Sequence, residues 1–340
     1  QFYKDFAAEI EDGTSPLVQS GYLFLAGDQA GLQAARDRVV VQHGAGLAEV
    51  ELLEGDALRE RFPFVGPDVL GGTWCPSDGF LLPALVYQEA TRRARELGAD
   101  VRQSCRVTGA RAEGGRLVAL ETSKGPVEAD LFVDCTNAWS PRLARSIGAA
   151  ELPIEPLKRY LWFLQREGSL TGDQLAAMPL TITPGGIYCR PENRDTLMMG
   201  KAHTTPADPG FSYDDQDTVE PRFSHKTGID AVPFELWMEL AEALPPVGEF
   251  GGIMATTAGY YAVTPDHNPF MGYDPQLANL VRLVGFSGHG AMFGPFTARV
   301  ARTLAEAGRD VDAVQVGDDA VDIRAFAIDR PFGHAESMVI

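Results

Sequence analysis

Apolar and polar residues recur along this chain of 340 residues with two different periods. Apolar positions three or four apart predict helices over 29–43 and 83–97, and Gly98 ends the second. Short apolar runs with alternating character, such as 21–26, indicate strands. By the same criteria we expect helices over 2–10, 54–62, 140–147, 234–244 and about 295–307, strands over 69–75, 99–107, 127–134, 159–165, 181–183, 186–189, 196–199, 251–263 and from Leu280, and a surface loop over 206–221.

A glycine-rich turn, Gly285–Gly290, follows the apolar strand that begins at Leu280. Glycine lets backbone approach a neighbour closely because it lacks Cβ, and the helix expected next offers unpaired N–H groups at its start. Together they suit an electron-rich ligand such as a reduced flavin ring or a phosphate. The alternative is an ordinary strand-to-helix turn.

The order of elements between residues 83 and 134 is helix, strand, hairpin and strand, with the hairpin turning at Gly114–Gly115. This order is typical of the second half of a doubly wound dinucleotide-binding domain. A complete Gly-x-Gly-x-x-Gly fingerprint is absent from the sequence. Gly44-Ala45-Gly46 begins the pattern, but Glu49 stands where the third glycine belongs.

Composition narrows the function classes. The chain has 47 acidic and 29 basic residues, a formal charge of −18, and such a surface repels nucleic acid and anionic membranes. Neither a stretch of transmembrane length nor a signal-peptide pattern is found, so we expect a cytoplasmic protein without a membrane span. The four cysteines are widely spaced, and we expect no metal site.

Two late motifs carry a resemblance to a known family. They are Tyr-x-x-Thr-Pro-Asp-His-x-Pro, which begins at Tyr261, and Gly-Phe-Ser-Gly-His-Gly, residues 285–290. The pair resembles the C-terminal signature of the D-amino-acid-oxidase-like FAD enzymes, in the branch of sarcosine oxidase, dimethylglycine oxidase and sarcosine dehydrogenase. Four further segments agree with the family in the same order: 20–25, 78–83, 131–140 and 187–192.

The resemblance implies an α/β fold in which an FAD-binding Rossmann-like domain and a β-sheet-rich substrate domain are interleaved. We expect the FAD domain over 1–18, 76–150 and 278–308, the substrate domain over 19–75 and 151–277, and an unassigned tail over 309–340. The first βαβ unit of the family, which carries the glycine fingerprint, is then missing from this chain.

The same resemblance implies the residues that bind FAD. In the turn that matches the family's Ala-Gly-Ala-Trp sequence, Asn137 replaces a glycine, and asparagine tolerates the left-handed conformation. The strand residue Val107 is expected beside the adenine, although a core position explains it equally well. The expected cofactor-binding residues are Val107, Thr136, Asn137, Ala138, Trp139, Gly285, Ser287, Gly288, His289, Gly290 and Met292.

Three residues are expected to serve the substrate. Arg190 suits a substrate carboxylate, since arginine makes bidentate contacts, and the alternative is a structural arginine between strands. Tyr260 or Tyr261, and Tyr261 first, is expected to form a wall of the site, and the alternative is an aromatic residue of the core or the sheet. His289 either transfers a proton or is a neutral, hydrogen-bonded imidazole.

Departures from the family pattern limit the substrate and the cofactor linkage. Gly259 stands where monomeric sarcosine oxidases carry the cysteine that binds the flavin, so FAD is not attached there. Met292 replaces a lysine that binds the substrate carboxylate, and Lys201 lies out of register with the lysine that promotes reaction with oxygen. The position of Lys201 favours an electron acceptor other than oxygen, unless the alignment differs there, so the acceptor is expected to be oxygen or another carrier.

The sequence predicts FAD-dependent oxidation of a small secondary or N-methyl amine or amino acid by hydride transfer to flavin. One alternative is a flavin-free relative, truncated or acting as a scaffold. A weaker alternative is FAD-dependent oxidation of a hydroxy acid or glycerol phosphate on the same fold. The sequence does not determine the oligomeric state.

Overall fold

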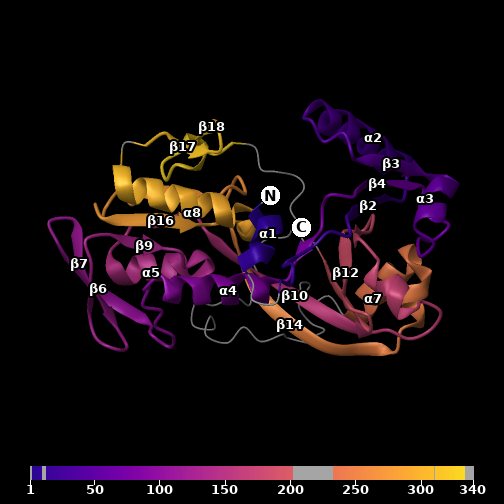
Figure 1. The fold of residues 1–340 in the computed structure, drawn as a ribbon, viewed down its shortest axis with the longest axis horizontal. Helices are drawn as coiled ribbons and strands as arrows, with labels where there is room; N and C mark the ends of the chain where they lie inside the picture. Colours follow the sequence, from indigo (N-terminus) through magenta and orange to yellow (C-terminus); the bar gives the residue numbers. More distant parts are fainter. Residues whose placement is uncertain (1, 10–12, 202–232, 310, 334–340) are drawn as a thin grey trace.

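The computed structural model describes residues 2–9, 13–201, 233–309 and 311–333, which form two lobes side by side (Figure 1). One lobe contains helices α5 and α8 with strands β6, β7, β9 and β16. The other contains helices α2, α3 and α7 with strands β2, β3, β4 and β12, and the long strands β10 and β14 run beneath. The loop expected over 206–221 lies outside the described residues.

An eight-stranded sheet organises the second lobe. Its strand order is β14-β10-β13-β12-β11-β2-β4-β3, and the pairs are antiparallel except for β11 with β2. The bounds are β2 (Tyr22–Ala26), β3 (Glu51–Glu54), β4 (Gly71–Cys75), β10 (Glu155–Gln165), β11 (Leu180–Ile182), β12 (Ile187–Asn193), β13 (Thr196–Lys201) and β14 (Gly252–Val263).

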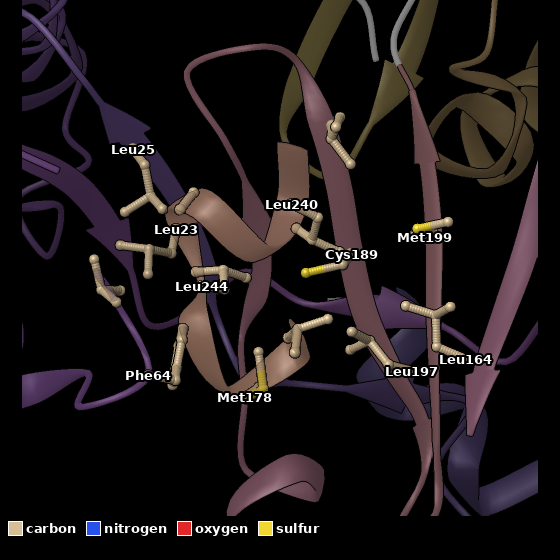
Figure 2. Packing of buried hydrophobic residues seen from close by; sticks show 14 of the residues in the cluster. Leu23, Leu25, Phe64, Leu164, Met178, Cys189, Leu197, Met199, Leu240 and Leu244 are labelled. Carbon is tan, nitrogen blue, oxygen red and sulfur yellow. The ribbon is translucent and has the colours of Figure 1, made fainter. Parts of the chain in front are cut away.

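The main hydrophobic core lies on one face of this sheet, against helix α7 (Pro233–Ala243). Alternation along β10 directs Trp162 and Leu164 into this core, while the intervening Phe163 packs on the opposite face. Figure 2 shows Leu240 and Leu244 packed against sheet residues that include Cys189 and Leu23. One sheet face is thus closed by α7, and the other is available for a site.

A three-stranded sheet lies in the first lobe, in the order β15-β16-β9. Strands β9 (Phe132–Asp134) and β16 (Leu280–Val284) run parallel, and β15 (Phe270–Tyr273) pairs antiparallel with β16. Within the described ranges β9 is the edge strand, and Val133 is 46% exposed. The remaining strands are β1 (Leu17–Val18), β5 (Phe80–Leu81), β6 (Val107–Glu113), β7 (Arg116–Thr122), β8 (Val127–Glu128), β17 (Ala313–Val316) and β18 (Asp319–Asp322).

The helices begin and end at local sequence signals. Asp28 caps α2, accepting a hydrogen bond from the Gly31 amide at 2.7 Å, and Gly148 ends α5 with a φ of +73°. None of the described helices is both long enough and apolar enough to cross a bilayer. The bounds are α1 (Phe2–Asp5), η1 (Phe6–Glu9), α2 (Gln29–Gly44), α3 (Gly55–Arg61), α4 (Pro83–Glu96), η2 (Asn137–Trp139), α5 (Ser140–Ile147), α6 (Gly172–Ala176), η4 (Pro245–Glu249), α8 (Gly290–Ala307) and η5 (Arg324–Phe326).

Three expectations about elements were wrong or incomplete. The strand expected over 99–107 is absent until Val107, because the segment before it is polar and Ser104 has a φ of +52°. Strand β3 was not expected, since its glutamates gave no apolar run. The tail over 309–340 was left unassigned, yet its described part forms the β17–β18 hairpin and contributes to a core with α8.

The start of the last long helix also differs from expectation. The helix expected over about 295–307 begins at Gly290 in the structure, so Pro295 lies inside α8. Proline has no N–H to offer the carbonyl of Ala291 four residues earlier. The Tyr3 hydroxyl donates a hydrogen bond to that carbonyl instead.

The strands of the eight-stranded sheet lie within residues 22–75 and 155–263, whereas β9, β15 and β16 form a separate three-stranded sheet. The expected domain boundaries remain a prediction, since sheet membership does not by itself define a domain.

Candidate functional site

Parallel pairing of β9 with β16 brings two turns together. The first turn, residues 136–139, follows β9, and the second, residues 285–290, follows β16. Asp134 pairs with Arg282, and each strand is followed by its turn at the same edge of the sheet. Asn137, at a φ of +50°, accepts hydrogen bonds at Oδ1 from the amides of Gly285 (3.0 Å) and Phe286 (3.2 Å). The asparagine that replaces the expected glycine therefore ties one turn to the other, and these two amides are engaged within the protein.

A buried ion-pair cluster holds the base of both turns. Arg282 donates to Asp134 and Asp274, each at 2.9 Å, and all three side chains are almost completely buried. Asp134 also accepts from the amide and the hydroxyl of Thr136, at 2.8 and 2.6 Å. Arg282 thereby fixes the direction in which the chain leaves β9.

A cavity of about 570 Å³ lies beside the first turn. It brings Val107 of β6 together with Thr136 and Trp139, which are about thirty positions later in the chain. Two arginines, Arg106 and Arg142, make its wall basic. The other lining residues are Cys105, Thr108, Leu143 and Ser146. Ala138 does not line it, because its side chain is buried in the core beside Phe270 and Val284.

The second turn leads directly into α8. His289 is the N-cap residue, Ser287 is buried, and its Oγ accepts a hydrogen bond from the Thr264 amide at 3.1 Å. Met292, in the first turn of the helix, is 67% exposed. The amides of the first helical turn have no partner within the helix, so His289, Gly290 and Met292 surround a weakly positive helix end.

Tyr261 of β14 packs directly on this turn. A Cβ added at Gly288, which has a φ of +96°, would lie 2.6 Å from the Tyr261 ring. Two constraints therefore require glycine at position 288: the positive φ of the backbone and the space that the Tyr261 ring occupies. This contact places Tyr261 at the junction between the glycine turn and the open face of the larger sheet.

Arginine and tyrosine side chains cross that face from β14 to β2. Arg159 of β10 lies next to Tyr261, with its guanidinium carbon 5.2 Å from the ring centroid. Tyr188 of β12 interacts electrostatically with Arg159, Arg190 and Tyr261, and Tyr22 of β2 interacts with Arg190 and Tyr261. We call Tyr22, Arg159, Tyr188, Arg190 and Tyr261 the arginine–tyrosine stripe.

Burial shapes the electrostatics of the stripe. Removal from water raises the pKa of the Tyr188, Tyr261 and Tyr22 phenols above the ordinary value, and Arg159 partly opposes this at Tyr188 and Tyr261. All three hydroxyls are therefore neutral donors at neutral pH. Burial also lowers the pKa of the Arg159 guanidinium, so an anion beside it would be stabilising.

Arg190 is anchored differently. Its Nη1 lies 2.7 Å from a carboxylate oxygen of Glu192 and donates to the Pro191 carbonyl at 3.0 Å. Its guanidinium carbon lies 4.5 Å above the Phe80 ring. Arg190 belongs to the stripe, and its Nη1 is engaged within the protein.

Two further charged residues have structural partners. Asp266 receives a bidentate contact from Arg330, with both distances 2.9 Å, and this arginine holds the pKa of the carboxyl below its usual range. Lys201 forms an ion pair with Glu239 of α7 at 3.2 Å. It therefore belongs with the helix-covered face of the sheet, away from the stripe.

Sequence reasoning missed Arg159 and Arg330. Arg159 is 7% exposed in a strand that is otherwise mostly apolar, and that interruption was a signal that could have been used. Arg330 lies in the tail, and no local pattern connects it with Asp266, which is 64 residues earlier.

The cavity beside the first turn has a lining that fits an FAD cofactor. Val107, Thr136 and Trp139, which the family resemblance implied independently, line a single cavity with basic walls, as a pyrophosphate-containing ligand requires. Among the described residues, no group of three or more histidine, cysteine, aspartate or glutamate side chains is arranged to hold a metal ion.

Comparison with known proteins agrees with the motifs. Residues 1–304 match the protein-family model described as FAD dependent oxidoreductase. Mitochondrial sarcosine dehydrogenase of Mus musculus is 29% identical over 82% of this chain and 29% of its own length. Monomeric sarcosine oxidase of Bacillus sp. (strain B-0618) is 25% identical, over 83% of this chain and 68% of the relative.

Solved structures show the same fold. Glycine oxidase from Geobacillus kaustophilus superposes with a TM-score of 0.78 over 98% of this chain and 80% of that chain, at 19% identity. L-proline dehydrogenase from P. horikoshii gives 0.75 over 90% and 77%, at 24% identity. The chain spans between 29% and 65% of the length of the first five curated relatives. Because the family model covers most of the sequence, this chain belongs to the FAD-dependent oxidoreductase family.

Proposed function

We propose that this chain supplies the substrate-binding part and much of the cofactor-binding part of an FAD-dependent oxidoreductase that oxidises a small amine or amino acid. The single observation that carries the proposal is the junction at Gly288. There the glycine turn that resembles the family's flavin contact meets Tyr261 and, through it, the arginine–tyrosine stripe. When bound, FAD would accept the two electrons that the substrate loses.

Arg159 is the residue that we propose for the substrate carboxylate. It stands beside Tyr261, whereas Arg190 is farther along the sheet and is engaged with Glu192. A carboxylate held by a buried guanidinium gains a strong, charge-assisted contact, and its own charge offsets the cost of burying the arginine. Arg159 would then bind the substrate carboxylate in place of the family's lysine, whose position Met292 occupies here.

The tyrosines would orient the substrate rather than exchange protons with it. Their raised pKa values keep the hydroxyls of Tyr188 and Tyr261 protonated across the physiological range. Each can donate a hydrogen bond to an anionic or carbonyl oxygen held between them. His289 stands at the N-cap of α8, where it can bond a polar group near the helix end, and a proton-transfer role for it remains a prediction.

The cofactor half of the proposal includes one expectation about the fold. The outer edge of β9 offers backbone groups to another parallel strand, and the family's first βαβ unit would pair there. Helix α4 has no fully buried residue in the structure, although its sequence is amphipathic, so its apolar side could cover such a unit.

The test uses the chain together with whatever coding sequence precedes it in frame. We expect the purified protein to carry flavin absorbance, and to reduce a dye when given N-methylglycine, proline or glycine. Arg159→Gln should raise KM by about 10- to 100-fold with a smaller change in kcat. Arg302→Gln, which removes a charge that is 78% exposed, is the matched control.

A folded protein that neither binds FAD nor reduces the dye with any of these amines contradicts the proposed function. An active protein in which Arg159→Gln leaves KM unchanged contradicts only the role of Arg159.

A further inference from the structure

A second large cavity lies in the sheet lobe, away from the arginine–tyrosine stripe. Its volume is about 650 Å³, within the usual range for sites that hold small organic molecules. Trp74, one of its walls, pairs in register with Leu23, and both pack in the core beneath α7. Tyr22, the neighbouring residue of β2, packs on the opposite face. The cavity and the stripe are therefore on opposite sides of the same sheet.

The walls of this cavity are largely apolar and aromatic. Phe62 meets the Trp74 ring edge-on, with centroids 5.7 Å apart, and Phe64 lies 5.8 Å from Phe62. Leu170 and Pro246 continue the apolar lining. A flat or branched hydrocarbon body would find matching surfaces here.

Arg61 is the one ionised residue that lines the cavity in the part of the chain that the structure describes. Its guanidinium carbon lies 4.4 Å from the Trp74 centroid, so the tryptophan supports the flat side of the group. Arg61 forms no salt bridge with any of the described residues. A guanidinium held by its face presents its N–H edge to a planar anion. The charge of this cavity is therefore positive, as is that of the cavity lined by Arg106 and Arg142.

Two of the lining residues also carry buried polar atoms. Ser20 Oγ and Trp74 Nε1 are both shielded from solvent without a hydrogen-bond partner among the described residues, and both residues line the cavity. Buried hydroxyl and indole N–H groups are normally satisfied by protein, water or ligand. The cavity surface thus combines a cation with an aromatic wall.

We propose that this cavity binds a small organic carboxylate with an apolar or aromatic body, at a site separate from the oxidation site. The carboxylate would contact the Arg61 edge, and the body would lie along Trp74, Phe62 and Phe64. This inference does not depend on the proposed oxidation chemistry.

Calorimetric titration with 2-naphthoate tests the proposal. We expect saturable binding at one site and binding of the uncharged 2-naphthamide that is weaker by about tenfold or more. Arg61→Gln should weaken naphthoate binding by a similar factor. Arg302→Gln, which removes the same charge in the other lobe, should leave it unchanged.

A cavity-filling variant separates a loss of naphthoate binding from a loss of folding. Ala177 is exposed at the cavity rim, so Ala177→Phe should fold and still obstruct the body of the ligand. Retained naphthoate binding in Arg159→Gln would assign it to this cavity rather than to the stripe. The proposal is overturned if naphthoate does not saturate, if Arg61→Gln and Ala177→Phe bind it as tightly as the parent chain, or if the amide binds equally well.

Discussion

Replacing Arg282 by methionine is the most direct test of how the turns after β9 and β16 are held. Arg282 is fully buried and donates to Asp134, Asp274, the Ala150 carbonyl and Ser140 Oγ at 2.9, 2.9, 3.0 and 2.6 Å. Methionine has a similar length and an apolar character, so Arg282→Met removes the charge and leaves little empty space.

The magnitude follows from what remains behind. Removing one partner of a buried ion pair costs about 3–5 kcal/mol, because a buried charge loses its compensation. Here two carboxylates lose one cation, which would suggest a larger loss. Each keeps other donors, however: Asp134 keeps the Thr136 amide, and Asp274 keeps the amides of Gln276 and Leu277. We therefore expect about 4–5 kcal/mol, near the upper end of the single-pair range.

Urea unfolding and thermal unfolding measure this loss. At about 2 °C per kcal/mol for a chain of this size, Tm should fall by about 8–10 °C. The triple variant Asp134→Asn, Asp274→Asn, Arg282→Met removes the charges together, and it should recover at least half of the loss because a neutral cluster has no uncompensated charge. Arg302→Met, which is exposed, should change the unfolding free energy by less than about 0.5 kcal/mol.

The reasoning is refuted if Arg282→Met folds with a loss below about 1 kcal/mol, or if the triple variant is as unstable as the single one. In the first case the charge would contribute little. In the second, the loss would come from packing rather than from the unpaired carboxylates.

Two further predictions concern the ends of the site. Asn137→Ala should lower the free energy of unfolding by about 2–3 kcal/mol, because the amides of Gly285 and Phe286 lose their acceptor and alanine is strained at positive φ. Asn137→Gly relieves the strain, so its loss should be about 1 kcal/mol smaller. Equal losses for the two variants in chemical denaturation would contradict the strain argument. The pKa of Asp266 is held low mainly by Arg330, so this carboxylate stabilises the fold above the pKa of an unfolded aspartate and the contribution is lost as the pH falls through the folded value. Arg330→Met should therefore lower the unfolding free energy at pH 7 by about 3–5 kcal/mol and by less near pH 3, and a difference that does not depend on pH would exclude this linkage.

Local patterns were sufficient for much of the fold. The helices over α2, α4 and α5 and the strands around β2, β10 and β14 follow from spacing and from end signals such as Asp28 and Gly148. Where the local signal was weak or misleading, prediction failed. Strand β3 consists of two leucines between glutamates. The last long helix was expected from about Pro295, but it begins five residues earlier, at Gly290.

The candidate site was only partly accessible in this way. Motif resemblance pointed to Gly288, Tyr261 and Arg190 individually, and the structure places Tyr261 on Gly288. It did not indicate Arg159, because the strand order that sets β10 beside β14 depends on residues about one hundred positions apart. Nor did it indicate that Asn137 would accept hydrogen bonds from the amides of Gly285 and Phe286, because this contact requires β9 and β16 to be neighbours.

The sequence by itself determined many of the elements and the family, because these depend on neighbouring residues and on short motifs. The tertiary structure decided which side chains share the stripe, which carboxylates surround Arg282 and where Arg61 meets Trp74. The physical reason is that electrostatics and burial depend on distance in space, and strand order sets those distances between segments that carry no local record of each other.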